Sequence, residues 1–167
     1  MYQIRVDIRA CLFIWLMLIS RAGMAEEFPE QSLVDELLEG ERPVGVVFLV
    51  MEYDPEALQW VVPRMAHYAR QLRAQWPDTA LVVISHGDEM FALQRQFEQL
   101  YTDIHQGVER LVEEYDVLFQ VCGSYAYQAD IDVSSFPDYV AVVPFAPAEI
   151  ENYRLLEYRM IDLELTW

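Results

Sequence analysis

Four short, continuous runs of apolar residues recur along the chain and set its organisation. They are rich in β-branched residues and lie at 44–51, 79–85, 116–122 and 138–145. Runs of this length without strict alternation are typical of strands buried on both faces of a parallel sheet. Residues 160–167 alternate apolar and polar side chains instead, which predicts a final strand at the edge of the sheet.

Helical patterns separate these runs. After the first run, Asp54 and Pro55 resemble a helix cap followed by a first-turn proline. Apolar positions at helical spacing then continue from Leu58 to Leu72. Pro63 interrupts this pattern, so we expect it to kink or split the helix.

Further helical segments are predicted on either side of the remaining runs. Thr102 is a candidate cap between two of them, and Gly40 ends the short one near the N-terminus. The predicted segments are 32–39, 88–100, 103–115 and 147–158.

The order β-α-β-α-α-β-α/loop-β-α-β predicts an α/β three-layer sandwich with a mainly parallel five-stranded sheet. We expect one α/β domain at residues 44–167, preceded by an N-terminal extension at 26–43 that contains the short helix. Ligands of such folds bind at the carboxyl ends of the strands. We therefore expect the functional residues at that edge of the sheet.

The first 25 residues have the pattern of an export signal. Basic residues precede an apolar run at 10–19, and Ala25 supplies a small residue for cleavage before Glu26. This run is shorter than the about 20 residues that a membrane-spanning helix needs. We expect a signal peptide at 1–25 and a periplasmic or secreted mature protein with no membrane span; the alternative is an uncleaved anchor.

The chain is strongly acidic. Its formal net charge is −17, and because three arginines and one aspartate of the signal contribute +2, the mature chain carries −19. All eleven basic residues are arginines. Such a charge repels nucleic-acid phosphates and anionic lipid surfaces, so we exclude both from the expected partners.

Cys122 is the candidate with the most chemical capability. Signal cleavage removes Cys11 and leaves Cys122 as the only thiol, so the mature chain cannot form an internal disulfide. Cys122 ends an apolar strand and precedes Gly123 and Ser124, where backbone N–H groups favour a thiolate. Free cysteines more often pack as small apolar side chains, so this alternative stays open.

Two other residues near strand ends are candidates for ligand binding. His86 could act as a base or orient a ligand, although His86, Gly87 and Asp88 could equally turn the chain into the next helix with Asp88 as cap. Tyr125 could line a pocket or pack. With Cys122 as catalytic residue, we take Gly123, Ser124, His86 and Tyr125 as the candidate substrate-binding residues.

Several familiar chemistries have no motif here. A phosphate-binding loop needs a lysine, and the chain has none. It also lacks the G-x-S-x-G motif of serine hydrolases and the C-x-x-C motif of disulfide exchange. Three scattered histidines do not provide zinc-ligand spacing. We expect no metal and no cofactor.

Three stretches together resemble the DsrE/DsrF-like family of sulfur-relay proteins. They are LVVISHGDEMFAL (81–93), VLFQVCGSYAYQADID (117–132) and YVAVVPFAPAEIENYRLLEYRMIDL (139–163). The resemblance implies a flavodoxin-like fold, homo-oligomers such as trimers or hexamers, and, in sulfur-handling members, a cysteine that carries sulfur as a persulfide. Cys122 is the matching position, whereas His86 and Gly87 match a turn to which no role is transferred.

Two hypotheses follow from the sequence. In the first, Cys122 accepts sulfane sulfur from a donor and passes it to an acceptor, as a carrier more than as a turnover enzyme. In the second, the chain is a non-catalytic oligomeric binding module with Cys122 in packing or at a subunit interface. The accessibility of the thiol in the folded protein distinguishes them.

Overall fold

A computed structural model describes residues 28–164, and its centre is a five-stranded sheet. All neighbouring strands pair in parallel, in the order β4-β3-β2-β1-β5. This confirms the predicted α/β class, with a sheet that is wholly parallel. The strands are β1 (Gly45–Val50), β2 (Ala80–Ser85), β3 (Val117–Cys122), β4 (Ala141–Val143) and β5 (Arg159–Asp162).

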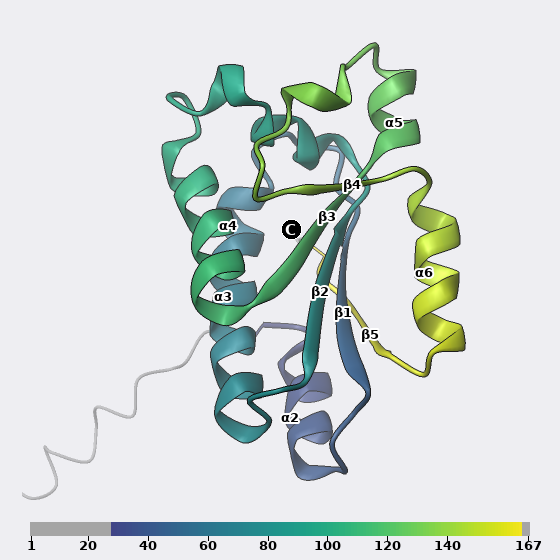
Figure 1. The fold of residues 1–167 in the computed structure, drawn as a ribbon. Helices are drawn as coiled ribbons and strands as arrows, with labels where there is room; N and C mark the ends of the chain where they lie inside the picture. Colours follow the sequence, from purple (N-terminus) through teal and green to yellow (C-terminus); the bar gives the residue numbers. More distant parts are fainter. Residues whose placement is uncertain (1–27, 165–167) are drawn as a thin grey trace, which may run out of the picture.

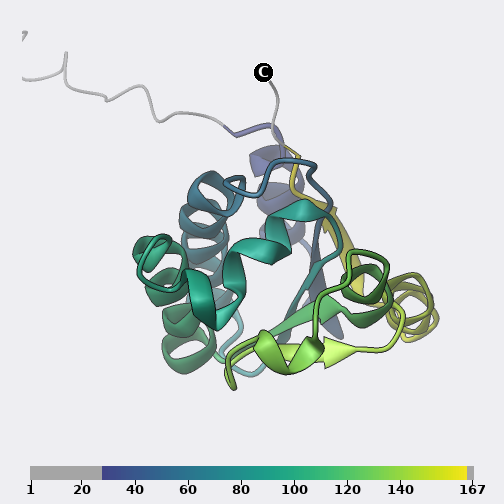
Figure 2. The same cartoon turned by 90° about the horizontal axis from the view of Figure 1, so that it is seen from above.

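Helices cover both faces of the sheet and complete a flavodoxin-like three-layer sandwich. Helices α3 (Leu58–Gln75) and α4 (Thr102–Tyr115) lie side by side on one face, and α6 (Ala146–Leu155) lies on the other (Figures 1 and 2). Crossovers between parallel strands are right-handed. The connections of β1–β2 and β2–β3 advance in one direction across the sheet, whereas β4–β5 returns across it, so α6 must lie on the opposite face.

The core lies mainly between the sheet and the pair α3 and α4. Phe48 of β1 and Phe119 of β3 are almost fully buried there together with Tyr68 and Met65 of α3. The rings of Phe48 and Tyr68 stack with centroids 6.2 Å apart. The continuous apolar runs in the sequence correspond to these doubly covered strands.

The N-terminal helix α2 (Gln31–Glu39) is attached to this core by a buried ion pair. The Arg64 guanidinium of α3 donates to both carboxylate oxygens of Glu30, and the exposed fractions of the two side chains are only 6% and 3%. Arg64 Nη1 also donates to the Glu164 carbonyl at 3.1 Å. One arginine therefore joins the segments before β1 and after β5.

Several helix predictions needed correction. Pro63 does not split α3, which is continuous and begins at Leu58. Residues 88–100 do not form an α-helix but two 3-10 segments, η2 (Asp88–Leu93) and η3 (Arg95–Phe97), separated by the extended residue Gln94. Thr102 is not a cap but the first residue of α4, and its hydroxyl donates to the carbonyls of the preceding turn.

The last two strands are shorter than predicted. A turn in which the Val140 N–H donates to the Pro137 carbonyl delays the start of β4 until Ala141. The strand β5 ends at Asp162, before most of the predicted 160–167 run. Between β3 and β4 the chain forms α5 (Gly123–Gln128) and the 3-10 segment η4 (Val133–Ser135).

The predicted signal peptide, with Cys11, lies outside the described residues. Within residues 28–164, no helix combines the length and apolar character needed to cross a membrane.

Candidate functional site

Cys122 lies where the sequence placed it, at the carboxyl end of β3, and it immediately precedes helix α5. The side chain is 0% exposed. Its Sγ accepts the backbone N–H of Ala146, at the start of α6, over 3.4 Å. The Ser124 hydroxyl lies 3.3 Å from the same sulfur and can donate to it. A thiolate or persulfide at this position would therefore meet two hydrogen-bond donors.

Gly123 and Ser124 hold the start of α5 against the end of β4. The Ser124 N–H donates to the Pro144 carbonyl at 3.0 Å. A Cβ atom on Gly123 would lie 3.1 Å from the Val143 carbonyl oxygen, closer than side chains normally come. The small residue at 123 thus allows the start of α5 to lie close against the end of β4.

His86 and Tyr125 form a second group at the same edge of the sheet. Their rings meet edge-on with centroids 5.6 Å apart, and Tyr125 also stacks on Phe91 at 5.7 Å. The Tyr125 hydroxyl donates to Asp88 over 2.8 Å, and this bond raises the pKa of the phenol to about 12. Asp88 therefore accepts from a distant helix and does not cap its own segment.

The environment of the His86 ring disfavours its charged form. Burial lowers the pKa of the imidazole, because the charged form loses its hydration. Its Nδ1 is buried, and no group within the described residues hydrogen-bonds to it. The ring is thus a candidate for contact with a ligand.

Glu89 organises the loop beside this group, and sequence reasoning missed it. It is fully buried, and burial raises the pKa of its carboxyl against the opposing effect of its hydrogen bonds. The carboxylate accepts the Ser85 hydroxyl at 2.7 Å, the N–H groups of His86 and Gly87 at 3.0 Å each, and the Glu52 N–H at 2.8 Å. It joins the ends of β1 and β2.

Gly87 shows how closely these two loops approach. A Cβ atom there would lie 2.4 Å from the Glu52 carbonyl oxygen, which belongs to backbone and cannot swing aside. The only sequence signal for Glu89 was an acidic residue following the S-H-G turn. One of its four donors, the N–H of Glu52, follows β1 and lies 37 residues earlier in the chain, and periodicity does not reveal such a contact.

The structure thus brings the candidates together as two neighbouring groups. Cys122, Gly123 and Ser124 surround the sulfur, while His86 and Tyr125 pair beside the Glu89 loop; Tyr125 belongs to α5 and links the two. None of the hydrogen bonds or ring contacts recorded for residues 28–164 joins His86 to Cys122. In that same part of the chain, no three His, Cys, Asp or Glu residues are arranged to hold a metal ion.

Comparison with known proteins supports the fold alone. No family model matches the chain, and no curated protein matches it in sequence. Its structure is similar to that of MTH1491, a protein of unknown function from Methanobacterium thermoautotrophicum. The two share 19% identity with a TM-score of 0.56, over 71% of this chain and 97% of the other. The similarity defines the α/β class to which this chain belongs.

Proposed function

We propose that this protein carries sulfane sulfur as a persulfide on Cys122. The observation that supports the proposal most is the position of the sulfur: it ends a parallel strand, where such folds bind ligands, and faces the Ala146 N–H and the Ser124 hydroxyl. Hydrogen bonds to an ionised group are stronger than those to a neutral one. These donors could therefore hydrogen-bond to the sulfur during attack and transfer.

The transfer itself is an exchange at sulfur and needs no external oxidant. The Cys122 thiolate attacks the outer sulfur of a persulfide or polysulfide donor and forms a new S–S bond. The donor's own S–S bond breaks, and its electron pair leaves with the donor thiolate. Delivery to an acceptor thiolate repeats the same step in reverse and regenerates the Cys122 thiolate.

Access to the thiol is the condition for this chemistry. Because Cys122 is 0% exposed, a donor reaches it only when its cover moves. The cover includes the turn that leads into α6, where Phe145 is 53% exposed although its neighbour Ala146 is buried. We expect opening of this turn to accompany transfer.

The alternative is an oligomeric binding module in which Cys122 packs and does not react. The complete burial of the side chain within the apolar core favours this alternative. The two functions differ in one measurable property, the reactivity of the thiol in the folded protein.

Intact-mass spectrometry after incubation with inorganic polysulfide tests the proposal directly. We expect the folded protein to gain whole sulfur atoms, dithiothreitol to remove them, and the Cys122→Ser variant to gain none at this position. A thiol that stays unmodified until denaturant is added would refute the carrier function and favour the binding module. Circular dichroism of the variant provides the control for folding.

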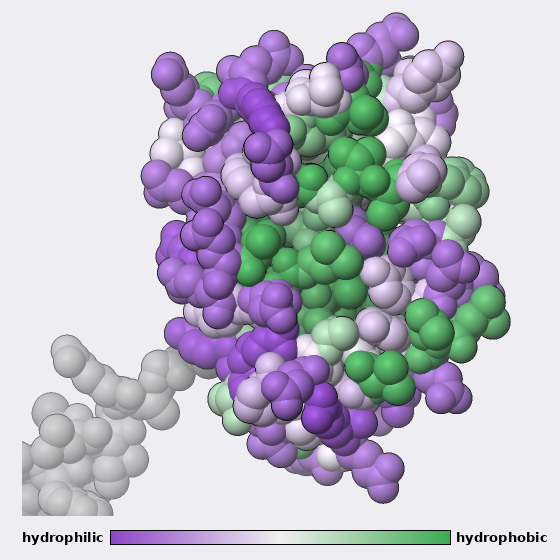
Figure 3. Space-filling view, in the orientation of Figure 1, coloured by the Kyte–Doolittle hydropathy of each residue, from purple (hydrophilic) through white to green (hydrophobic). Residues whose placement is uncertain are grey.

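We also propose that a second copy of the chain binds at the β4 edge of the sheet. Apolar side chains gather along the middle of the face shown in Figure 3, where β3 and β4 lie in Figure 1. Leu118 of β3 and Val142 of β4 are 45% and 38% exposed. Two copies of so acidic a chain approach most easily where neither presents charge. Homo-oligomerisation, expected from the family resemblance, would cover this edge.

A further inference from the structure

A groove of about 740 Å³ runs between helices α3 and α4, and neither Cys122 nor His86 is among its lining residues. Its lining includes apolar side chains, among them Val62 and Ala66. Gly107 of α4 lies against Val62, and a Cβ atom there would come within 2.5 Å of Val62 Cγ1. A side chain at 107 would therefore obstruct the space where the helices meet. The volume is that of a site for a small organic molecule.

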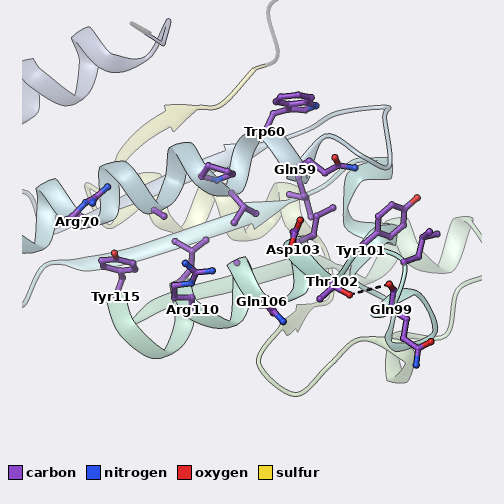
Figure 4. Close-up of a pocket in the computed structure, with 18 residues that line it drawn as sticks. Gln59, Trp60, Arg70, Gln99, Tyr101, Thr102, Asp103, Gln106, Arg110 and Tyr115 are labelled. Carbon is purple, nitrogen blue, oxygen red and sulfur yellow. Dashed lines mark hydrogen bonds between the residues drawn. The ribbon is translucent and has the colours of Figure 1, made fainter. Parts of the chain in front are cut away.

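The two ends of the groove differ in chemistry. Arg70, Arg110 and Tyr115 lie at one end, whereas Trp60 and Tyr101 lie at the other (Figure 4). Trp60 is 59% exposed, an unusual position for a large aromatic side chain. A ligand lying in the groove would contact an aromatic surface at one end and positive charge at the other.

The two arginines of the groove have no hydrogen-bond or ion-pair partner among residues 28–164, unlike most arginines of that range. Of the eight arginines in residues 28–164, five have a hydrogen-bond or ion-pair partner. The three without a partner among the described residues are Arg70, Arg110 and Arg159, and two of these three line the groove. In a chain of net charge −17, carboxylates are abundant, so two free guanidinium groups in one groove are an exception.

The residues that line the groove carry a positive formal charge. Asp103 is the only carboxylate among its lining residues, so two arginines against one aspartate give a formal charge of +1. Asp103 precedes Arg110 by seven residues along α4, which separates their backbones by about 10 Å at the rise of an α-helix. The carboxylate therefore lies towards the aromatic end and leaves the guanidinium end available to an anion.

We propose that this groove binds a small organic anion with an aromatic or other apolar body. The guanidinium groups of Arg70 and Arg110 would contact its acidic group. Trp60 and the apolar lining residues would contact its body. Guanidinium groups suit carboxylates and sulfonates because their N–H donors form a planar fork. The site is distinct from Cys122 and does not depend on sulfur transfer.

Fluorescence titration of the full chain with two matched probes tests the proposal. The first probe, 8-anilinonaphthalene-1-sulfonate, carries an anionic group, and the second, N-phenyl-1-naphthylamine, has the same rings without it. We expect the double variant Arg70→Gln/Arg110→Gln to bind the sulfonate about tenfold more weakly, the loss expected for two exposed charge contacts. Binding of the uncharged probe should stay unchanged. Trp60→Ala should weaken both probes.

Arg159→Gln is the matched control, because it removes an unpaired, exposed arginine outside the groove. It should leave sulfonate binding within about twofold of the wild type, as expected for a charge remote from the site. Three results would overturn the proposal: no binding of the sulfonate by the wild type, equal binding by the double variant, or the same loss in the control. Circular dichroism establishes that each variant is folded.

Discussion

Replacement of Glu89 by alanine should destabilise the protein by an amount that its hydrogen bonds define. The change removes the acceptor of four donors. The His86 N–H still donates to the Val50 carbonyl at 2.9 Å, and the Ser85 hydroxyl can rotate to another acceptor. The N–H groups of Gly87 and Glu52 lose this acceptor. An unsatisfied buried donor costs about 1–3 kcal/mol, so we expect a loss of about 1–3 kcal/mol from the buried Gly87 N–H.

Urea denaturation followed by circular dichroism measures this loss. In a thermal scan the same loss should lower the melting temperature by roughly 5 °C. Glu113→Ala is the matched control, because Glu113 is exposed on α4. Its effect should stay within about 0.5 kcal/mol. An unfolding free energy of Glu89→Ala equal to that of the wild type would refute the reasoning. It would mean that water accepts hydrogen bonds from the N–H groups of the loop as well as the Glu89 carboxylate does.

The pH dependence gives a second measure of the same carboxyl. Its pKa in the folded state is raised by burial, so the folded protein binds the proton more tightly than the unfolded chain does. The associated stability is complete below the unfolded pKa of about 4.3 and is lost as pH rises through the folded pKa. Glu89→Gln does not titrate. Any advantage of the wild type over this variant should therefore shrink with rising pH, and a constant difference would contradict the raised pKa.

Two further predictions concern the ion pair and the sheet edge. Arg64→Ala leaves Glu30 buried without its counterion and should lower the free energy of unfolding in urea by about 3–5 kcal/mol. The double variant Arg64→Met/Glu30→Leu should recover most of that loss. A loss below about 1 kcal/mol for Arg64→Ala would refute the importance of the pair. Val142→Asp should convert an oligomer into monomers in light scattering, while Val44→Asp, at a residue 59% exposed before β1, should not. A monomeric wild type, or an oligomer that tolerates Val142→Asp, would refute the proposed interface.

The strands were predictable from sequence because their physical signal is local. A strand covered on both faces needs mostly apolar residues, and β1, β2 and β3 each have at most one polar side chain. The start of β4 depends on the turn at Pro137. The segment after β2 forms a 3-10 helix because the Glu89 carboxylate accepts N–H groups of its own loop. Those contacts are set by the loop geometry, and hydrophobic periodicity does not report them.

The candidate site was predictable only in part, for the same reason. Parallel topology placed Cys122 and His86 at one edge of the sheet, as expected from the ends of their strands. The Ala146 donor to the sulfur and the Tyr125–Asp88 bond each join residues more than 20 positions apart. The groove between α3 and α4 was equally unpredictable from the sequence, because its character depends on which arginines have no partner after folding.

The pairing of β5 with β1 has a consequence for synthesis. Val46 lies beside Arg159, so the edge of β1 stays open until almost the whole chain has left the ribosome. Such a contact closes a long loop, and contacts of high sequence separation form slowly. An unpaired edge of the apolar strand β1 is a template for aggregation during that interval. Loss of only the residues after Leu156 would make this exposure permanent, since β1 would then have no partner on that side.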